Sequence, residues 1–209
     1  VELLIKKYQF DKKKVLDIGS SLGQTLFYWN KNSEGVEIDS RKIQLPRALG
    51  YTVHELDVEE GFPNLKEESY DAIYTNNLIE HLECPHLFLV RLYPLLKPKG
   101  ILAIGHPTVP PFPFRSLWKL FGYRGWLAKE HINFFTPQTA KLTLERAGFK
   151  IKNQHFAGAE RIHPILGKIF IPIGIRVLSI CQKIDGFEYP SKRLSEFDSS
   201  CASEHKYFR

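Results

Sequence analysis

Polar side chains end four apolar runs of the sequence, and together they could bind a small ligand. The runs begin near residues 15, 34, 51 and 70, and each would end in an acid or an amide. Open α/β sheets bind ligands beyond the carboxyl ends of their strands, so four such ends in register predict one site. Singly, each group is typical of a solvated or helix-capping position. The residues are Asp17, Glu37 with Asp39, Asp57, and Asn76 with Asn77.

The first run leads into a tight turn of small residues, "VLDIGSSLG" (15–23). A dinucleotide turn reads G-x-G-x-x-G, and this turn lacks the middle glycine. It also lacks the Lys-Ser/Thr pair of a phosphate cradle. A carboxylate at Asp17 suits a ligand with an amino group and would repel a phosphate. The turn therefore disfavours a nicotinamide oxidoreductase and predicts a ligand lying close to the backbone, with a helix from Leu22 onward.

Strand and helix patterns alternate over the first half of the chain. Strands are predicted in 14–20, 34–39, 51–57, 70–76 and 101–106, with helices after the first, second and fourth of these and a turn at 97–100. Such alternation with short turns produces right-handed βαβ units. We therefore expect an α/β fold with a doubly wound, mostly parallel sheet.

The sequence changes in character after His106. Four prolines in 107–113 exclude a regular helix there, and 115–122 favours one or two helical turns. Thr136 as N-cap, Pro137 and then Gly148 predict a helix between them, followed by a strand in 149–156. We predict a single domain over 1–209, with a lid or insertion at 107–135 and an irregular tail at 186–209. The apolar stretch 165–180 is too short and too interrupted for a membrane span, and we expect it to be buried, to form part of a lid or to rest on a membrane surface.

Six segments, in order and correctly spaced, resemble the class I S-adenosylmethionine (SAM) methyltransferases. They are "VLDIGSSLG", "GVEID", "ELDVEEGFP", "YDAIYTNNLIEHL", "LLKPKGILAI" and "HINFFTPQTAKLTLERAGF". The last is similar to a segment of the small-molecule branch that includes ubiquinone-type O-methyltransferases. The resemblance runs from about Lys14 to Lys152 and implies a seven-stranded Rossmann-like sheet, SAM as cofactor and S-adenosylhomocysteine as product.

The resemblance also implies a role for each strand-end residue. The turn would pass beneath the methionine part of SAM, and Asp17 would face its ammonium group. Glu37 would accept hydrogen bonds from both ribose hydroxyls, with Asp39 as the rival. Asp57 would accept from the adenine amino group, although it could instead cap a turn, and Asn76 would lie near the sulfonium. The turn residues are Gly19, Ser20, Ser21 and Gly23, and the residues expected against adenine are Ile38 and Val58.

Three histidines could assist proton removal from an acceptor hydroxyl, because imidazole titrates near neutral pH. His81 lies in "IEHL", His131 in "EHINFF", and His106 ends a strand before a proline. We take His131 or His81 as the catalytic candidates, with packing or lid-fastening roles as the alternative for each. We expect no metal site, because the cysteines show no zinc spacing.

The acceptor is predicted to be a small molecule with a hydroxyl group. Residues 76–79 lack the Asn/Asp-Pro-Pro-aromatic signature of amino-directed enzymes, and Cys84-Pro85 is reversed relative to a cytosine C5 nucleophile. Aromatic residues between 112 and 135 suit an apolar or ring-bearing acceptor, although a minor core explains most of them. Two alternatives stay open: a catalytically silent SAM-binding module and an RNA-directed methyltransferase.

Composition restricts the partners and the compartment. The chain has 209 residues, a formal net charge of +6 and 43% apolar residues. Lysines gather between residues 6 and 14, but the aromatic residues there are not interleaved in a pattern that would read bases, so nucleic acid is an unlikely partner. Three well-separated cysteines and no recognisable secretory leader favour the cytoplasm.

Overall fold

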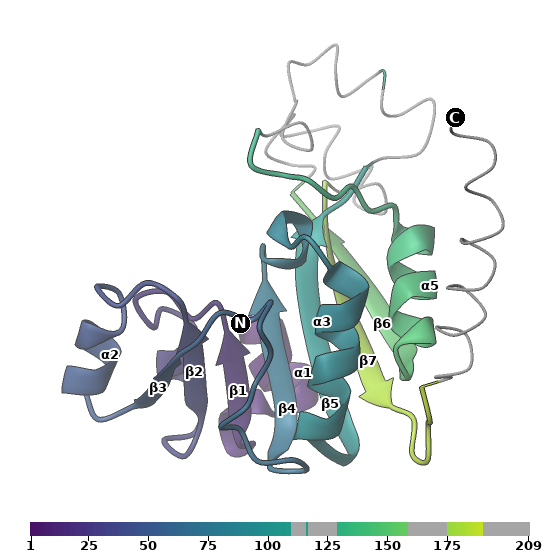
Figure 1. Cartoon of the computed structure of the whole chain (residues 1–209). Helices are drawn as coiled ribbons and strands as arrows, with labels where there is room; N and C mark the ends of the chain where they lie inside the picture. The colour runs from purple at the N-terminus through teal and green to yellow at the C-terminus, as the bar shows by residue number, and fades with distance from the viewer. Residues whose placement is uncertain (110–115, 117–128, 159–174, 190–209) are drawn as a thin grey trace, which may run out of the picture.

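Seven strands form one sheet in the computed structural model of the chain, which describes residues 1–109, 116, 129–158 and 175–189. The strands are β1 (Val15–Ile18), β2 (Glu34–Glu37), β3 (Thr52–Glu55), β4 (Tyr70–Asn76), β5 (Leu96–Pro107), β6 (Phe149–Ala157) and β7 (Arg176–Lys183). Their order is β3-β2-β1-β4-β5-β7-β6 (Figure 1). After β3 the chain crosses to the other side of β1, so the order reverses between β1 and β4. This reversal is where open α/β sheets bind their ligands.

The sheet is mostly parallel, as predicted, with one antiparallel strand. Neighbouring strands from β3 to β5 pair in parallel, whereas β7 pairs antiparallel with both β5 and β6. All four residues of β1 are buried. This matches the continuous apolar run expected of a central parallel strand that is covered on both faces.

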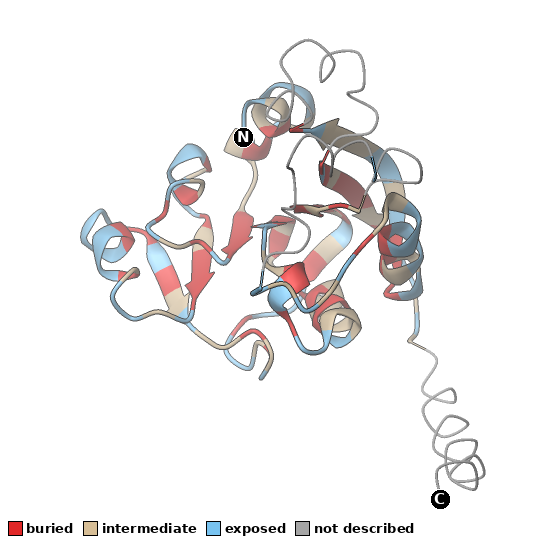
Figure 2. Cartoon of the chain, turned by 90° about the horizontal axis from the view of Figure 1, so that it is seen from above, coloured by how far each residue is buried: buried red, intermediate tan, exposed pale blue. Residues whose placement is uncertain are grey.

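Helices cover both faces of the sheet and enclose two cores. In Figure 1, α3 (Pro85–Leu92) and α5 (Pro137–Arg146) lie in front of the sheet and α1 (Glu2–Tyr8) lies behind it. Leu89 and Leu144 belong to the front core, and Leu4 and Phe10 to the rear core. Viewed from above, buried residues follow the strands while exposed residues lie on the outer faces of the helices (Figure 2). The other helical segments are α2 (Gln44–Ala48), η1 (Phe10–Lys12), η2 (Leu26–Tyr28), η3 (Ile79–His81) and η4 (Tyr93–Leu95).

The helix predicted from Leu22 is wrong. Gly23 has a φ of 83°, in the left-handed region that a right-handed helix cannot contain. Only the short 3₁₀ helix η2 follows, closed by a hydrogen bond from the Trp29 amide to the Leu26 carbonyl. The glycine turn therefore continues into irregular chain before β2.

The turn predicted at 97–100 lies inside strand β5 instead. Tyr70 pairs with Leu96 and Ala72 pairs with Ile101, so four residues of β5 stand opposite one residue of β4. Lys99 takes a left-handed φ of 60° within this bulge. The proline and glycine of this segment thus bend the strand rather than ending it.

The helix predicted between Thr136 and Gly148 is confirmed. The Thr136 side chain accepts from the Thr139 amide, Pro137 opens the helix, and Ala147 is its C-cap. Gly148 follows with a φ of 90°. A Cβ atom there would lie 2.5 Å from the Phe187 ring, so the position excludes larger residues for steric reasons as well.

The two ends of the segment predicted to be a lid or insertion lie next to each other. Thr108 and Phe135 form an isolated bridge, and the Thr108 hydroxyl donates to the Phe135 carbonyl at 3.1 Å. Most of the segment between them, 110–115 and 117–128, lies outside the described residues, as do the expected helical turns and all but two of the aromatic residues. The tail beyond 189 is also outside them.

Part of the apolar stretch 165–180 is a sheet strand. Residues 176–180 belong to β7, between β5 and β6, and 165–174 lie outside the described residues. In the described part, Ile175, Val177, Ser179 and Ile180 are buried as expected, whereas Arg176 is exposed. No helix among the described residues has the length and apolar character needed to cross a membrane.

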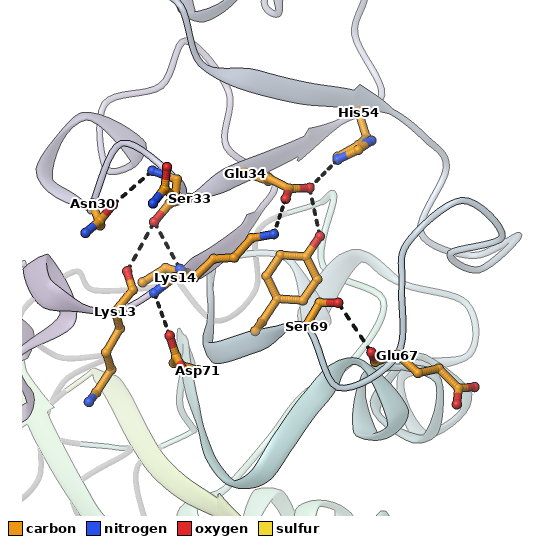
Figure 3. Close-up of polar contacts among 12 residues, drawn as sticks. Lys13, Lys14, Asn30, Ser33, Glu34, His54, Glu67, Ser69 and Asp71 are labelled. Atoms are coloured by element: carbon orange, nitrogen blue, oxygen red, sulfur yellow. Dashed lines mark hydrogen bonds and ion pairs between the residues drawn. The ribbon is translucent and has the colours of Figure 1, made fainter.

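The amino ends of the strands are joined by a network of charged groups (Figure 3). Glu34, the first residue of β2, pairs with Lys14 at 2.5 Å and with His54 at 2.7 Å, and it accepts from the Tyr70 hydroxyl at 2.8 Å. Burial alone would raise the pKa of Glu34, but these partners together hold the pKa below its ordinary value. The charged groups at the amino ends of these strands are therefore paired with one another.

Candidate active site

The turn after β1 brings the backbone close to the end of β2. Ser21 has a left-handed φ of 49°, which is uncommon for a residue with a side chain. Its amide donates to Glu37 Oε2 at 2.9 Å, so the strained turn is fastened to the last residue of β2. Gly23 permits this path, because a Cβ atom there would lie 2.6 Å from the Phe27 ring.

Glu37 presents its carboxylate at the carboxyl end of the sheet. Its second oxygen, Oε1, accepts from the Asp39 amide at 3.0 Å. Both described partners are backbone amides, and each carboxylate oxygen can accept more than one hydrogen bond. The carboxylate is therefore held in place and keeps acceptor capacity for a ligand.

Asp39, the alternative ribose acceptor to Glu37, forms an ion pair with Arg41. Arg41 donates to both of its carboxylate oxygens, at 2.9 Å and 2.8 Å. The hydrogen bonds from Arg41 lower the pKa of Asp39 to about 2. An acid paired in this way is a poorer ribose acceptor than Glu37.

A cleft of about 420 Å³ lies beyond these strand ends. This is within the size range of small-molecule and cofactor sites. Six of the residues predicted to bind SAM line it, namely Gly19, Ser21, Glu37, Ile38, Asp57 and Val58. Residues from three strand ends thus meet around one cavity at the reversal of strand order.

Two residues expected to contact adenine, Ile38 and Asp57, both line the cleft. Ile38 is 62% exposed, a large value for an isoleucine and one that suits an uncovered ligand-facing side chain. Asp57 Oδ1 accepts from the Glu59 amide at 2.9 Å, so it does cap a turn. It also lines the cleft, and the two roles are compatible because a carboxylate has several acceptor sites.

Four predicted binding residues do not line the cleft: Asp17, Ser20, Gly23 and Asn76. The Ser20 side chain is buried against Gly35 of β2, where it leaves no room for a Cβ atom. The Asn76 amide lies against Gly105 of β5 in the same way, and the following residue, Asn77, lines the cleft instead.

Asp17 is buried behind the glycine turn. Its Oδ2 accepts from the Thr25 hydroxyl at 2.6 Å and from the Trp29 indole at 3.1 Å. Burial raises the pKa of Asp17 to about 6, although both hydrogen bonds act to lower it. Asp17 thus fixes the segment after the turn, and its charge depends on pH in a range where few carboxyl groups titrate.

The two candidate catalytic histidines contact each other, but neither is among the residues that line the cleft. The rings of His81 and His131 lie edge to face with centroids 5.0 Å apart. His81 Nδ1 is 2.9 Å from the Glu130 carbonyl, so that nitrogen carries the proton and donates. Partial burial and the neighbouring His81 lower the pKa of His131, which favours a neutral ring at neutral pH.

Sequence analysis missed Glu80, which lies directly before His81. It is 1% exposed, and neither carboxylate oxygen has a hydrogen-bond partner among the described residues. Burial raises the pKa of Glu80, against the influence of its own backbone amide, His81 and Arg176. A buried acid within "IEHL" was the available signal, but only the fold shows that it is unpartnered.

His106, the third histidine, is buried. Its Nδ1 lies 2.8 Å from the Pro107 carbonyl, and its ring packs edge to face on Phe135. Burial lowers the pKa of His106. The His106 ring is thus held by its neighbours, and His106 does not line the cleft.

A methyltransferase domain family matches residues 1–154 of the sequence. The match includes every strand that contributes to the cleft. The chain belongs to this family. It is a methyltransferase, and SAM is its cofactor.

Solved structures of SAM-dependent methyltransferases share the fold of this methyltransferase. One from Thermotoga maritima is 23% identical with a TM-score of 0.62, and the alignment covers 87% of this chain and 87% of that chain. One from Archaeoglobus fulgidus is 20% identical with a TM-score of 0.64, covering 87% and 92%. One from Mesorhizobium loti is 17% identical with a TM-score of 0.62, covering 83% and 92%. No curated protein matches the sequence.

Proposed function

We propose that this methyltransferase transfers the methyl group of SAM to a hydroxyl group of a small, apolar or ring-bearing molecule. The observation that carries the proposal is that acids at the strand ends line a cleft whose wall also includes the two leucines flanking the η3 segment, from which His81 contacts His131. Leu78 and Leu82 line the cleft on the two sides of the η3 segment that contains His81. A methyl acceptor in this position would lie between the cofactor and the histidines.

The cofactor is proposed to lie across the ends of β1, β2 and the segment after β3. Glu37 holds the ribose hydroxyls, Asp57 receives the adenine amino group, and Ile38 packs on the ring. The glycine turn runs beneath the methionine part, and Asp17 acts on the ammonium group from behind the turn. Asn77, rather than Asn76, is the amide that faces the methyl-transfer end.

The acceptor class is supported by apolar side chains beside the histidines. Ile132 and Phe134 are 56% and 51% exposed, directly after His131 and near the return of the insertion. Exposed apolar residues beside a candidate catalytic histidine suit an apolar acceptor better than a charged one. An RNA acceptor is less supported, because Lys6 pairs with Glu2 and Lys14 with Glu34.

Transfer is an in-line displacement in which the acceptor oxygen attacks the methyl carbon and the carbon–sulfur bond breaks. The oxygen must lose its proton, and the histidine pair is placed to assist. Such assistance contributes about 10²–10⁴-fold in rate. Positioning of the reactants contributes roughly 7–11 kcal/mol in favourable cases.

The test is a transfer assay with SAM labelled in the methyl group. Phenols, other hydroxyl compounds, amines and bulk RNA are offered as separate pools. We expect label in a hydroxyl compound, and a fall of about 10²-fold or more in turnover for His81→Ala or His131→Ala. His155→Ala is the matched control, since His155 contacts Tyr8 away from the cleft. Label in RNA alone, or unchanged turnover and pH profile in both histidine variants, would contradict the proposal.

A further inference from the structure

One side-chain cluster beside the cleft has the composition of a metal site. Glu80, His81 and His131 each offer one ligand atom, and these atoms all lie within 4.8 Å of one another. Among the described residues, this is the one group of three or more His, Cys, Asp or Glu side chains close enough together to hold a metal ion. Two imidazoles and one carboxylate are ligands that zinc and other divalent transition metals accept.

Glu80 is the strongest sign that a cation belongs there. Its carboxylate is almost fully buried, and among the described residues neither oxygen has a hydrogen-bond donor. The groups that act to lower the pKa of this carboxyl are its own backbone amide, His81 and Arg176, and none of them is within hydrogen-bond geometry of the carboxylate. Burying a carboxylate without a partner costs several kcal/mol, so a site with this carboxylate is incomplete as it stands.

His81 is already oriented as metal-binding histidines are. Because a carbonyl oxygen only accepts, the 2.9 Å contact between Nδ1 and the Glu130 carbonyl fixes the proton on Nδ1. The lone pair is then on Nε2, which lies 3.9 Å from Glu80 Oε1. A second-shell carbonyl that orients the ring in this way is a regular feature of metal-ligating histidines.

The backbone holds the third ligand in place. The Glu80 carbonyl accepts from the amides of Ile132 and Asn133, both at 3.0 Å, and the Asn133 side chain donates to the Leu82 carbonyl at 2.5 Å. These bonds fasten the segment after His131 to η3. Ligand atoms at about 2.1 Å from a zinc ion lie about 3.4 Å apart in tetrahedral geometry, so small side-chain rotations would close the site.

The geometry points to a divalent transition-metal site formed by the Glu80 carboxylate, His81 Nε2 and an imidazole nitrogen of His131. Three protein ligands leave at least one coordination position open, as in catalytic rather than structural zinc sites. The hard cation Mg²⁺ suits the site less well, because it prefers oxygen ligands.

The use of the open position rests on the proposed function. An acceptor hydroxyl oxygen bound there would have a lowered pKa and would release its proton to water. The oxygen–methyl bond then forms as the methyl–sulfur bond breaks, and the electron pair of that bond neutralises the sulfonium. The two histidines would in this case assist as ligands instead of as bases.

Calorimetry with Zn²⁺ tests the site directly. The chain, free of any histidine tag, is stripped with a chelator, dialysed and titrated with zinc chloride. We expect one ion per chain in the wild type, and affinity at least 30-fold weaker in Glu80→Gln and in His131→Ala. His155→Ala is the control and should bind like the wild type. No binding to the wild type, or equal binding to all variants, would overturn the inference.

Two further readouts keep the result interpretable. Glu80→Gln removes a buried charge without changing shape, so the apo variant should unfold at the wild-type temperature or above, while Zn²⁺ should raise that temperature only in the wild type and the control. SAM titration of the metal-free protein tests the cofactor site separately. If label transfer persists in full after chelation, the metal inference fails while the proposed function stands. If zinc binds but no hydroxyl compound is methylated, the site stands and the proposed acceptor fails.

Discussion

Strand β2 carries a glutamate at each end, and the two carboxylates have opposite surroundings. Glu34, at the amino end, contacts an ammonium, an imidazole and a phenol hydroxyl. Glu37, at the carboxyl end, contacts only backbone amides among the described residues and lines the cleft. The Glu34 carboxylate is paired with side chains of the protein, whereas the Glu37 carboxylate is held by backbone amides and can still accept hydrogen bonds from a ligand. A structural acid and a binding acid thus stand at the two ends of one four-residue strand.

The largest expected effect is the loss of SAM affinity in Glu37→Ala. Two charge-assisted hydrogen bonds to the ribose would be removed, which costs roughly 2–4 kcal/mol, or about 30- to 1000-fold in Kd. Calorimetry with SAM and with S-adenosylhomocysteine measures the change. Asp39→Asn is the control and should stay within about threefold of the wild type, since exposed ion pairs contribute little. Equal losses of SAM affinity in Glu37→Ala and Asp39→Asn would contradict the assignment of the ribose to Glu37 rather than to Asp39.

Glu34→Gln should instead weaken the fold and leave SAM affinity unchanged. We expect a loss of roughly 1–3 kcal/mol in the free energy of unfolding, measured with urea, because three partners of a carboxylate lose their anion. The pKa of Glu34 is lowered in the folded protein, so its stabilisation is present above the unfolded value of 4.5 and is lost as pH falls below it. The difference between wild type and variant should therefore shrink in acid. If Glu34→Gln weakened SAM binding and left stability unchanged, Glu34 would be a binding acid and our assignment of a structural role to it would be wrong.

Asp17 gives a pH test of the cofactor site. Its pKa is about 6 in the free protein, and a bound ammonium would lower that pKa, so SAM binds better once Asp17 is ionised. Affinity should be level above pH 7 and fall up to about tenfold by pH 5, the effect of one pKa unit. Asp17→Asn should flatten this profile. A wild-type profile as flat as that of the variant would exclude Asp17 from the methionine end.

The smallest effect is expected for Ser21→Gly. A left-handed φ costs a residue with a side chain about 1–2 kcal/mol, while the extra freedom of glycine in the unfolded chain offsets about 0.4–1 kcal/mol. The variant should be slightly more stable, by 2–4 °C at most in Tm for a chain of this size. Thermal unfolding measures it. A clear destabilisation would show that the Ser21 side chain contributes a contact that outweighs the strain.

The sequence was most informative where structure is local. The strand ends and the Thr136 cap depend on neighbouring residues, and six of the ten predicted cofactor residues line the cleft. The predicted helix after Leu22 failed because a left-handed Gly23 cannot be read from helical spacing. The sequence could not show which of Asn76 and Asn77 lines the cleft, because neighbouring residues at the end of a strand point to opposite sides.

Glu80 and its surroundings could not be predicted. The contact between His81 and the Glu130 carbonyl joins residues 49 positions apart, and no periodicity links them. That Glu80 is buried without a hydrogen-bond partner among the described residues is visible only in the folded chain. Sequence analysis expected no metal site because it considered the cysteines, whereas the candidate ligands are a glutamate and two histidines.

The most direct test of the central claim is a crystal structure of the chain with S-adenosylhomocysteine. The account predicts that the ligand crosses the ends of β1 and β2, with both ribose hydroxyls within hydrogen-bond distance of the Glu37 carboxylate and adenine beside Ile38 and Asp57. Ligand density elsewhere on the molecule, or a ribose that contacts Asp39 while Glu37 keeps only its backbone partners, would contradict it.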